Sequence, residues 1–168
     1  MLIRRLVPAD AVSYQTLRLQ ALRETPTAFS SSYEEERDTP ITSIAAHMAP
    51  DSGRNRFGAF DGDTLVGVVG LGRETAAKLR HKAFIGGMYV APGYRAQGLG
   101  RQLMAQALAL AAEMDGVLQI ELTVTQGNAA ALFLYKELGF VEFGCAPAAL
   151  MVDGTLHDVV YLQRPVRR

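Results

Sequence analysis

One glycine-rich segment constrains this chain more than any other feature. It covers residues 89–104 and reads YVAPGYRAQGLGRQLM. The pattern predicts the end of a strand, a bend, and a long helix over about residues 99–115 that opens with Gly98 and Gly100. Glycines allow the backbone to approach a ligand closely, and the unpaired amides of a helix N-terminus attract negative charge. Arg95 can add a charge-assisted hydrogen bond to a phosphate, so the segment predicts an anion site.

Two other phosphate-binding loops do not fit this segment. A nucleotide P-loop ends in GK[ST], which is absent, and a dinucleotide fingerprint has a third glycine where this chain has Leu103. The glycine loop alone is also compatible with a simpler interpretation, in which Gly98 and Gly100 only cap and pack the helix.

A pair of glycines interrupts the preceding strand, which we expect over residues 83–90. Glycine inside a strand often marks a bulge or a close approach of a ligand. A bulge at Gly86-Gly87, just before Met88, would free backbone groups to bind an extended chain. A purely structural kink explains the same pair equally well.

A second motif lies on a short helix expected over residues 128–138. Asn128 and Tyr135 are seven residues apart, about 20° short of two full turns, so they share one face. The small Ala131 between them leaves room for a ligand. The alternative is that Asn128 is an N-cap and Tyr135 is a half-buried packing residue.

The rest of the chain alternates strands and helices without a repeat or linker, so we expect one α+β domain over residues 1–168. Ser32 and Glu35 form a capping box for a helix reaching about residue 48. The other expected elements are a strand at 2–7, a helix at 10–23, a hairpin at 56–71, an alternating strand at 117–125, and a second tight turn at Asp153-Gly154.

Composition excludes several classes of protein. Lys plus Arg and Asp plus Glu both number 17, and this balance argues against nucleic acid as a partner. No apolar run approaches the ~20 residues of a membrane span, and no secretory signal is visible, so we expect a cytoplasmic protein.

The lone Cys145 cannot form an internal disulfide and is expected in the core. His47, His81 and His157 lack the spacing of metal ligands, so we expect no metal site.

Residues 83–140 resemble the GNAT superfamily of N-acetyltransferases. The pyrophosphate loop R-x-x-G-x-G is matched by Arg95, Gly98 and Gly100, and the helix motif N-x-x-A-x-x-x-Y-x-x-x-G-F is matched from Asn128 to Phe140. The resemblance implies a mixed, mostly antiparallel sheet that is splayed at an acetyl-CoA site and flanked by about four helices. It also implies direct transfer of the acetyl group from acetyl-CoA to a primary amine of a small molecule or peptide.

The resemblance also implies roles for individual residues. The amides of the glycine loop would hold the pyrophosphate, the bulged strand would pair with the pantetheine, and an amide near Met88 would steady the oxyanion. Tyr135 would protonate the departing thiolate as the catalytic acid. The implied cofactor-binding residues are Met88, Tyr89, Val90, Arg95, Ala96, Gln97, Gly98, Leu99, Gly100, Arg101, Asn128 and Tyr135.

The chain departs from the family where many relatives carry an acidic residue. Residues 84–90 contain no carboxylate, and the segment 144–150 reads GCAPAAL where a related subgroup has G-x-E-P-x-A-L. The general base is therefore open. The candidates are Glu121, Glu34, Glu35, Asp158 or a water relay.

Other interpretations stay open at this point. Cys145 with His157 would make a ping-pong acyltransferase. A non-catalytic acyl-CoA-binding module would tolerate the altered 144–150 segment. The acidic residues 34–36 would suit a cationic acceptor, although the capping box explains them as well. Relatives often form dimers, so a homodimer is possible.

Overall fold

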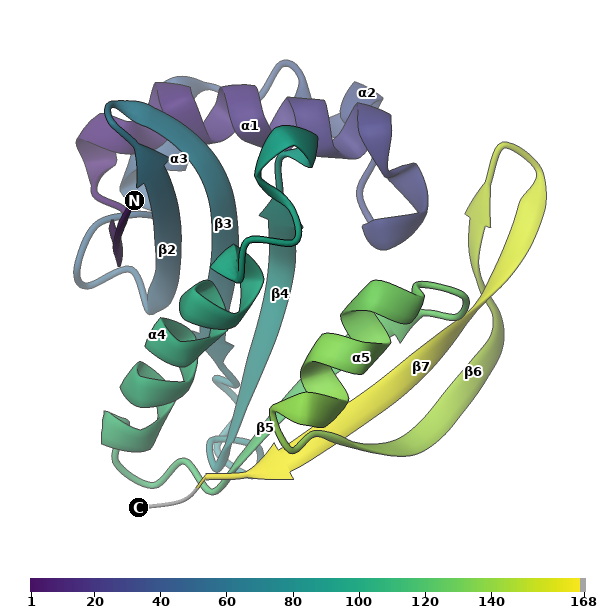
Figure 1. The fold of residues 1–168 in the computed structure, drawn as a ribbon. Helices are drawn as coiled ribbons and strands as arrows, with labels where there is room; N and C mark the ends of the chain where they lie inside the picture. The colour runs from purple at the N-terminus through teal and green to yellow at the C-terminus, as the bar shows by residue number, and fades with distance from the viewer. Residues whose placement is uncertain (167–168) are drawn as a thin grey trace.

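The computed structural model describes residues 1–166, whose centre is one seven-stranded sheet (Figure 1). In spatial order the strands are β1 (Leu2–Arg5), β2 (Arg54–Asp61), β3 (Thr64–Arg73), β4 (Lys82–Val90), β5 (Gln119–Thr125), β7 (Thr155–Pro165) and β6 (Val141–Val152). Only β4 and β5 pair in parallel, and all other neighbours are antiparallel. The expected mixed, mostly antiparallel sheet is confirmed.

The sheet opens between its two parallel strands. β4 and β5 pair only at residues 82–84 and 119–121, after which the strands diverge. The opening exposes backbone groups along the edge of β4 that faces β5. This splayed gap divides the sheet into an N-terminal part, β1 to β4, and a C-terminal part, β5 to β7.

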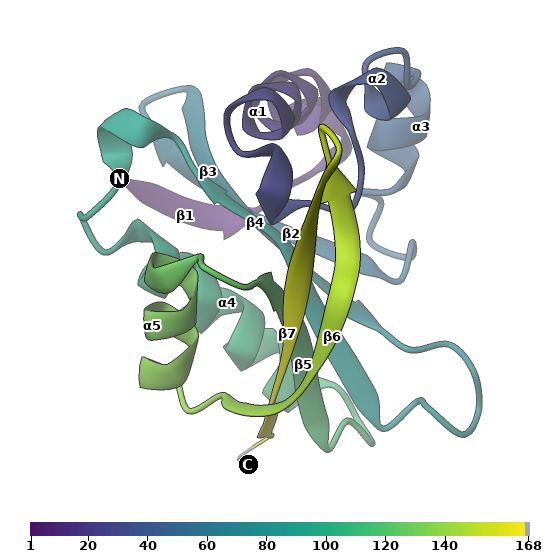
Figure 2. The same cartoon turned by 90° about the vertical axis from the view of Figure 1, so that its right-hand side faces the viewer.

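Helices cover both faces of the sheet. One face carries α1 (Ala11–Glu24), α2 (Tyr33–Glu36) and α3 (Ile41–Ala46), and the other carries α4 (Leu99–Glu113) and α5 (Ala129–Glu137), as Figures 1 and 2 show. The connections include short 3-10 turns, η1 (Pro8–Asp10), η2 (Pro26–Ala28) and η3 (Pro92–Tyr94). Among the described residues, no helix has the length and apolarity that crossing a bilayer requires.

Each face has its own hydrophobic core. Leu99, Leu103 and Ala107 of α4 are buried in one cluster with β-strand side chains such as Val69. A second cluster packs α1 and α3 on the opposite face, where Leu17 is buried. Burial of a large aliphatic side chain contributes about 1.5–3 kcal/mol, so these two cores hold the strands in place beside the gap.

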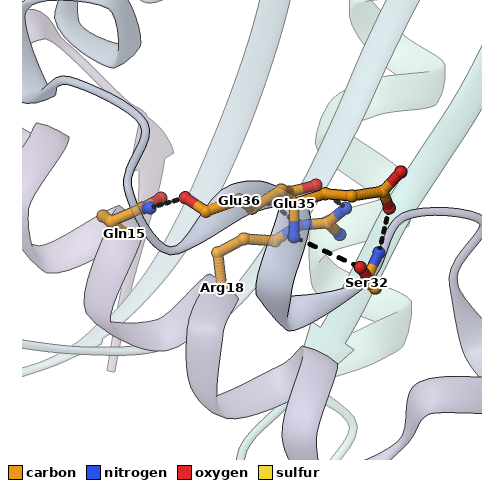
Figure 3. Close-up of polar contacts among 5 residues, drawn as sticks. All are labelled: Gln15, Arg18, Ser32, Glu35 and Glu36. Atoms are coloured by element: carbon orange, nitrogen blue, oxygen red, sulfur yellow. Dashed lines mark hydrogen bonds and ion pairs between the residues drawn. The ribbon is translucent and has the colours of Figure 1, made fainter.

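The helix expected from Ser32 to about residue 48 is wrong as a single element. The capping box is confirmed: Glu35 N donates to Ser32 Oγ at 3.2 Å, and Ser32 N donates to the Glu35 carboxylate at 2.7 Å (Figure 3). The chain leaves the helix after α2 and starts α3 with Pro40 as N-cap. Proline has no amide to donate and disfavours helical backbone in the preceding residue, which explains the interruption.

Two further expectations fail at the C-terminal part of the sheet: a core position for Cys145, and a place for Leu118 on the buried face that alternation along residues 117–125 predicts. Cys145 is exposed, not in the core, because it lies on the edge strand β6, whose only neighbour is β7. Leu118 precedes β5 and is exposed, while Ile120, Leu122 and Val124 form the buried face as expected.

Candidate active site

β4 contains the expected β-bulge, which begins at the second glycine of the pair. Val68 pairs with Tyr89 and Gly70 pairs with Gly86, so Gly87 and Met88 together oppose a single residue of β3. Gly87 has φ of +63°, a left-handed conformation that favours glycine. The bulge lies where β4 diverges from β5, at the centre of the splayed gap.

Two cavities meet at this bulge. One, of about 470 Å³, lies between the glycine loop, β4 and α5, and we call it the loop cavity. The other, of about 600 Å³, lies between α1, η2 and the strands β2 to β7, and we call it the arginine cavity. Met88 lines the first, Gly87 lines the second, and Ala28 lines both. The two cavities therefore border the bulge at adjacent residues.

The loop cavity collects nearly all the residues expected to bind the cofactor. Only Gln97 lies outside its lining, and its side-chain Nε2 donates to the carbonyl of Gly93 at 3.2 Å. The expected residues that line the cavity are Met88, Tyr89, Val90, Arg95, Ala96, Gly98, Leu99, Gly100, Arg101, Asn128 and Tyr135.

The glycine loop presents a row of free backbone amides. Ala96 and Gly98 have φ of 59° and 77°, so the chain turns twice through left-handed backbone before α4 begins. The first helical hydrogen bond is donated by Gln102 N to Gly98 O at 3.1 Å. The amides of residues 96–101 donate to no acceptor within residues 1–166. Unpaired amides at a helix N-terminus are an anion site, and the left-handed Ala96 is the kind of backbone strain found at functional sites.

Arg95 adds positive charge beside these amides. Its Nε donates to the carbonyl of Val90 at 2.8 Å, and its guanidinium lies 5.5 Å from the ring centre of Tyr89. This hydrogen bond holds the guanidinium at the wall of the loop cavity, where its other nitrogens can meet an anion.

Gly100 allows α4 to approach α5 closely. A side chain there would come within 3.2 Å of Leu134 Cδ2 and 3.4 Å of Met88 Cε, both from residues that line the loop cavity. Any larger residue would push these side chains aside, so Gly100 shapes the cavity. Gly98 differs because a side chain there would meet only open space, and its left-handed backbone is what requires glycine.

Tyr135 reaches the loop cavity from a buried position. The residue is only 6% exposed, and its ring meets Phe140 edge-on at 6.0 Å. Its hydroxyl makes no hydrogen bond within residues 1–166, and no fully buried side-chain N or O in this part of the chain lacks a partner, so the hydroxyl must face open space. Burial raises the pKa of Tyr135 to about 12, which keeps the phenol protonated at neutral pH.

Asn128 shares this face of α5, as the helical spacing predicts. Its side-chain oxygen accepts a hydrogen bond from Ala131 N at 3.2 Å, so it is the N-cap of the helix. It also lines the loop cavity together with Ala131. Capping and contact with a ligand are therefore compatible roles for this residue.

Arginine is the dominant charge of the second cavity. Arg18 comes from α1, and Arg54 and Arg56 come from β2, while no carboxylate of residues 1–166 lines either cavity. The sequence analysis missed these three residues. The sequence gives only a weak indication of this cavity. Arg54 and Arg56 are two positions apart on a strand and so point to the same face, but only the topology brings Arg18 beside them.

The four candidate bases have other partners or positions. Glu121 pairs with Lys82 at 2.7 Å, Asp158 accepts from Ala148 N at 2.8 Å, and Glu35 caps α2. Glu34 is exposed, and none of the four lines a cavity.

The histidine and cysteine candidates are not assembled into a site. Cys145 pairs with Val160 in the sheet, whereas His157 pairs with Leu150, which separates the two by three positions along β7, roughly 10 Å. Within residues 1–166, no three His, Cys, Asp or Glu side chains are grouped so that they could hold a metal ion.

Comparison with known proteins fits this geometry. The model of the acetyltransferase (GNAT) family matches residues 18–140, which include the bulge, the glycine loop and α5. The chain belongs to the GNAT family. Its relatives include the N-alpha-acetyltransferase RimI of Mycobacterium tuberculosis, which is 33% identical over 119 residues, 70% of this chain and 72% of RimI.

Solved GNAT structures share the fold. A putative acetyltransferase from Salmonella typhimurium, solved with its cofactor acetyl-CoA, has a TM-score of 0.86 at 20% identity. The match covers 100% of this chain and 95% of the Salmonella chain. A ribosomal-protein-alanine N-acetyltransferase from Brucella melitensis has a TM-score of 0.80 at 23% identity, with 98% and 99% covered. The GNAT enzyme described here thus keeps the family's sheet and helices over essentially its whole length.

Proposed function

We propose that this GNAT enzyme binds acetyl-CoA in the loop cavity and transfers its acetyl group directly to a primary amine that enters through the arginine cavity. The observation that carries the proposal is the row of free amides at residues 96–101 beside Arg95, at one end of a cavity that leads to the bulge. A diphosphate is the anion that such a row suits.

The chain offers a place for each part of the donor. The amides of the loop and Arg95 bind the pyrophosphate, and the pantetheine arm lies between α5 and the unpaired edge of β4. An extended ligand can add to that edge as a further strand, with Asn128 as a side-chain contact. The thioester then reaches the bulge, where Met88 lies between the two cavities.

The transfer makes a carbon–nitrogen bond, breaks a carbon–sulfur bond and moves one proton from nitrogen to sulfur. The amine nitrogen attacks the thioester carbonyl carbon, the carbonyl oxygen takes up negative charge beside the backbone amide near Met88, and the carbon–sulfur bond then breaks. The hydroxyl of Tyr135 donates its hydrogen to the departing sulfur, and the resulting phenolate recovers a proton from the nitrogen of the new amide through water. Because its pKa is about 12, Tyr135 is protonated when the donor binds and holds the proton until charge builds up on sulfur.

The attacking amine must first lose a proton. Since no carboxylate of the described residues lines either cavity, a water chain is the route that best fits the site. The guanidinium groups of the arginine cavity help, because a positive environment disfavours an ammonium ion and lowers the pKa of the bound amine.

The proposal is tested by measuring acetyl-CoA binding and thiol release with the same protein. We expect acetyl-CoA to bind, and thiol to be released only when a suitable amine is added. Absence of acetyl-CoA binding would refute the proposal. Binding without thiol release across amino acids, polyamines, amino sugars and peptide N-termini would favour a non-catalytic acyl-CoA-binding module.

A further inference from the structure

We propose that the acceptor is a small primary amine with a carboxylate next to its amino group, as in a free amino acid, and that the arginine cavity binds this carboxylate. The inference rests on the function proposed above and narrows its acceptor. Three features carry it: one arginine aimed at the bulge, two further arginines on β2, and a lining to which residues 1–166 contribute no acidic side chain.

Arg18 is held rigidly with one nitrogen left over. Its Nε and Nη2 donate to the carboxylate of Glu36 at 2.9 and 2.8 Å (Figure 3). Its guanidinium also lies 4.6 Å from the ring centre of Phe29. Nη1 has no partner within residues 1–166 and lies 4.0 Å from the point where a side chain of Gly87 would begin. The Arg18 side chain is 13% exposed, so a preorganised donor points at the bulge from inside the cavity.

Arg56 lies across a bare stretch of sheet from the same point. Arg56 pairs with Gly70, and Gly70 pairs with Gly86, so three neighbouring strands place one arginine and two glycines in a row. Directly opposite residues in a sheet point to the same face. Neither glycine has a side chain, so no side chain of this row lies between Arg56 and the backbone of β4 beside Gly87.

Arg54 extends the positive surface along β2. Arg54 pairs with Gly72 of β3, and Gly72 pairs with Phe84 of β4, whose ring covers the glycine. Neither Arg54 nor Arg56 pairs with a carboxylate in the described part of the chain. Arg54 Nη1 lies 3.4 Å from His47 Nδ1, and burial together with the two arginines lowers the pKa of His47. The lowered pKa favours the neutral form of the imidazole, so the positive charge of this surface comes from the arginines.

The acidic segment that would suit a cationic acceptor is used elsewhere. Glu35 caps α2, Glu36 is neutralised by Arg18, and Glu34 lines neither cavity. Three guanidinium groups against one carboxylate leave the cavity with a positive surplus. Polyamines and other purely cationic amines are repelled, whereas a carboxylate is attracted.

The geometry requires that the carboxylate and the amine be close together. In an α-amino acid the amine is only two bonds from the carboxyl carbon. A carboxylate on Arg18 Nη1 therefore places the amine beside the bulge, where the acetyl group arrives. A peptide N-terminus has an amide at this position and gives the arginines no charge to bind. The apolar remainder of the lining, including Phe29, Phe84, Ile85 and Leu150, suits an uncharged side chain.

Three probes of one shape test the inference: leucine, leucinamide and 3-methylbutylamine. They share the side chain and the primary amine but differ in the group beside it: a carboxylate, a neutral amide or a hydrogen. We expect kcat/KM for leucine to exceed that for each of the others by tenfold or more, as for loss of a charge-assisted hydrogen bond. Equal or higher kcat/KM for leucinamide would overturn the inference.

Variants assign the effect to the arginines. Arg56→Gln should raise KM for leucine about tenfold or more while changing KM for leucinamide little. Arg54→Gln should act in the same direction more weakly, because Arg54 is exposed. Arg18→Lys keeps the positive charge and a partner for Glu36, so the variant should fold. It loses the planar guanidinium with several donors, so leucine turnover should fall. Arg37→Gln is the matched control, since this exposed arginine lines neither cavity.

A second readout separates this inference from the proposed function. Isocaproate, which is leucine without its amine, should bind the arginine cavity in calorimetry and bind at least tenfold more weakly to Arg56→Gln. If acetyl-CoA binds but isocaproate does not and leucine is not preferred, the carboxylate inference fails and the acetyltransferase proposal stands. If acetyl-CoA itself does not bind, the proposed function fails first.

Discussion

At the scale of single residues, the burial of Tyr135 is compatible with the role of general acid proposed for it. The phenol lies among apolar side chains, which raises its pKa to about 12, yet its hydroxyl faces the loop cavity. An ordinary tyrosine has a pKa of about 10, so burial widens the pH range over which the group keeps its proton.

Tyr135→Phe should lower kcat by about 10²-fold or more while leaving KM for acetyl-CoA nearly unchanged. The substitution removes only the hydroxyl and keeps the ring that packs against Phe140, so the variant should fold normally. Steady-state kinetics with thermal unfolding as a control measure both effects. An unchanged kcat would remove Tyr135 from the role of general acid.

The pH dependence provides a second check on the same residue. Since the folded pKa lies above the ordinary value, Tyr135 stays protonated up to and beyond about pH 10. The profile of kcat against pH should therefore show no alkaline fall below that pH that is caused by Tyr135. A fall near pH 8 that disappears in Tyr135→Phe would contradict the assignment.

At the scale of elements, α1 and α2 are joined by polar contacts that also position the arginine cavity. Gln15 donates to the backbone carbonyl of Glu36 at 2.8 Å, and Arg18 binds its carboxylate through two nitrogens (Figure 3). The hydrogen bonds from Arg18 lower the pKa of the Glu36 carboxyl. The free nitrogen of Arg18 can face the bulge only while this pairing holds.

The pairing predicts a specific acid sensitivity. A carboxyl whose pKa is lowered in the folded state stabilises the protein above its unfolded pKa, and this contribution is lost as pH falls through the folded pKa. The free energy of unfolding should therefore decline below about pH 4.5 more steeply in the wild type than in Glu36→Gln. Urea unfolding measures it, with Glu34→Gln as an exposed control; parallel curves for wild type and Glu36→Gln would contradict the prediction.

The element scale also explains what could be predicted from the sequence. The bulge, the capping box and the shared face of α5 follow from local spacing, so they were predictable from Gly86-Gly87, Ser32 with Glu35, and Asn128 with Tyr135. The break before α3 was readable from Pro40 and was still missed. The exposure of Cys145 depends on β6 being an edge strand, which is a property of the topology and not of the segment.

The arginine cavity could not be predicted for the same reason. Arg18 and Arg56 are 38 positions apart in the sequence, and they meet only because α1 packs on the face of β2 and β3. No local pattern encodes that packing. The loop cavity was predictable because its two motifs lie within about 50 residues and match a known family.

At the scale of the whole molecule, the two parts of the splayed sheet share a hydrophobic core, but their strands pair at only one end of the gap. β4 belongs to one part and β5 to the other, and the loop cavity is lined by β4, α4 and α5. A ligand that touches these elements together links the two parts. The fold thus leaves a gap that is open to a ligand.

Acetyl-CoA should therefore stabilise the folded protein measurably. At a concentration of about 100 times Kd, linkage predicts a gain of about 2.7 kcal/mol in the free energy of unfolding and a higher Tm. Acetyl-pantetheine, which lacks the pyrophosphate, should give a much smaller shift at the same concentration because it leaves the amides of residues 96–101 unpaired. Equal shifts for the two ligands would argue against the pyrophosphate site.

The binding of acetyl-CoA to a glycine-loop variant tests the central claim most directly. Gly98→Ala strains left-handed backbone at the start of α4, whereas Gly93→Ala is a matched control, since its added methyl group meets open space and its φ is not left-handed. In calorimetry we predict wild-type affinity for Gly93→Ala and at least tenfold weaker binding for Gly98→Ala, with both variants folded. Equal affinity of Gly98→Ala and the wild type would contradict the assignment of the glycine loop as the pyrophosphate site.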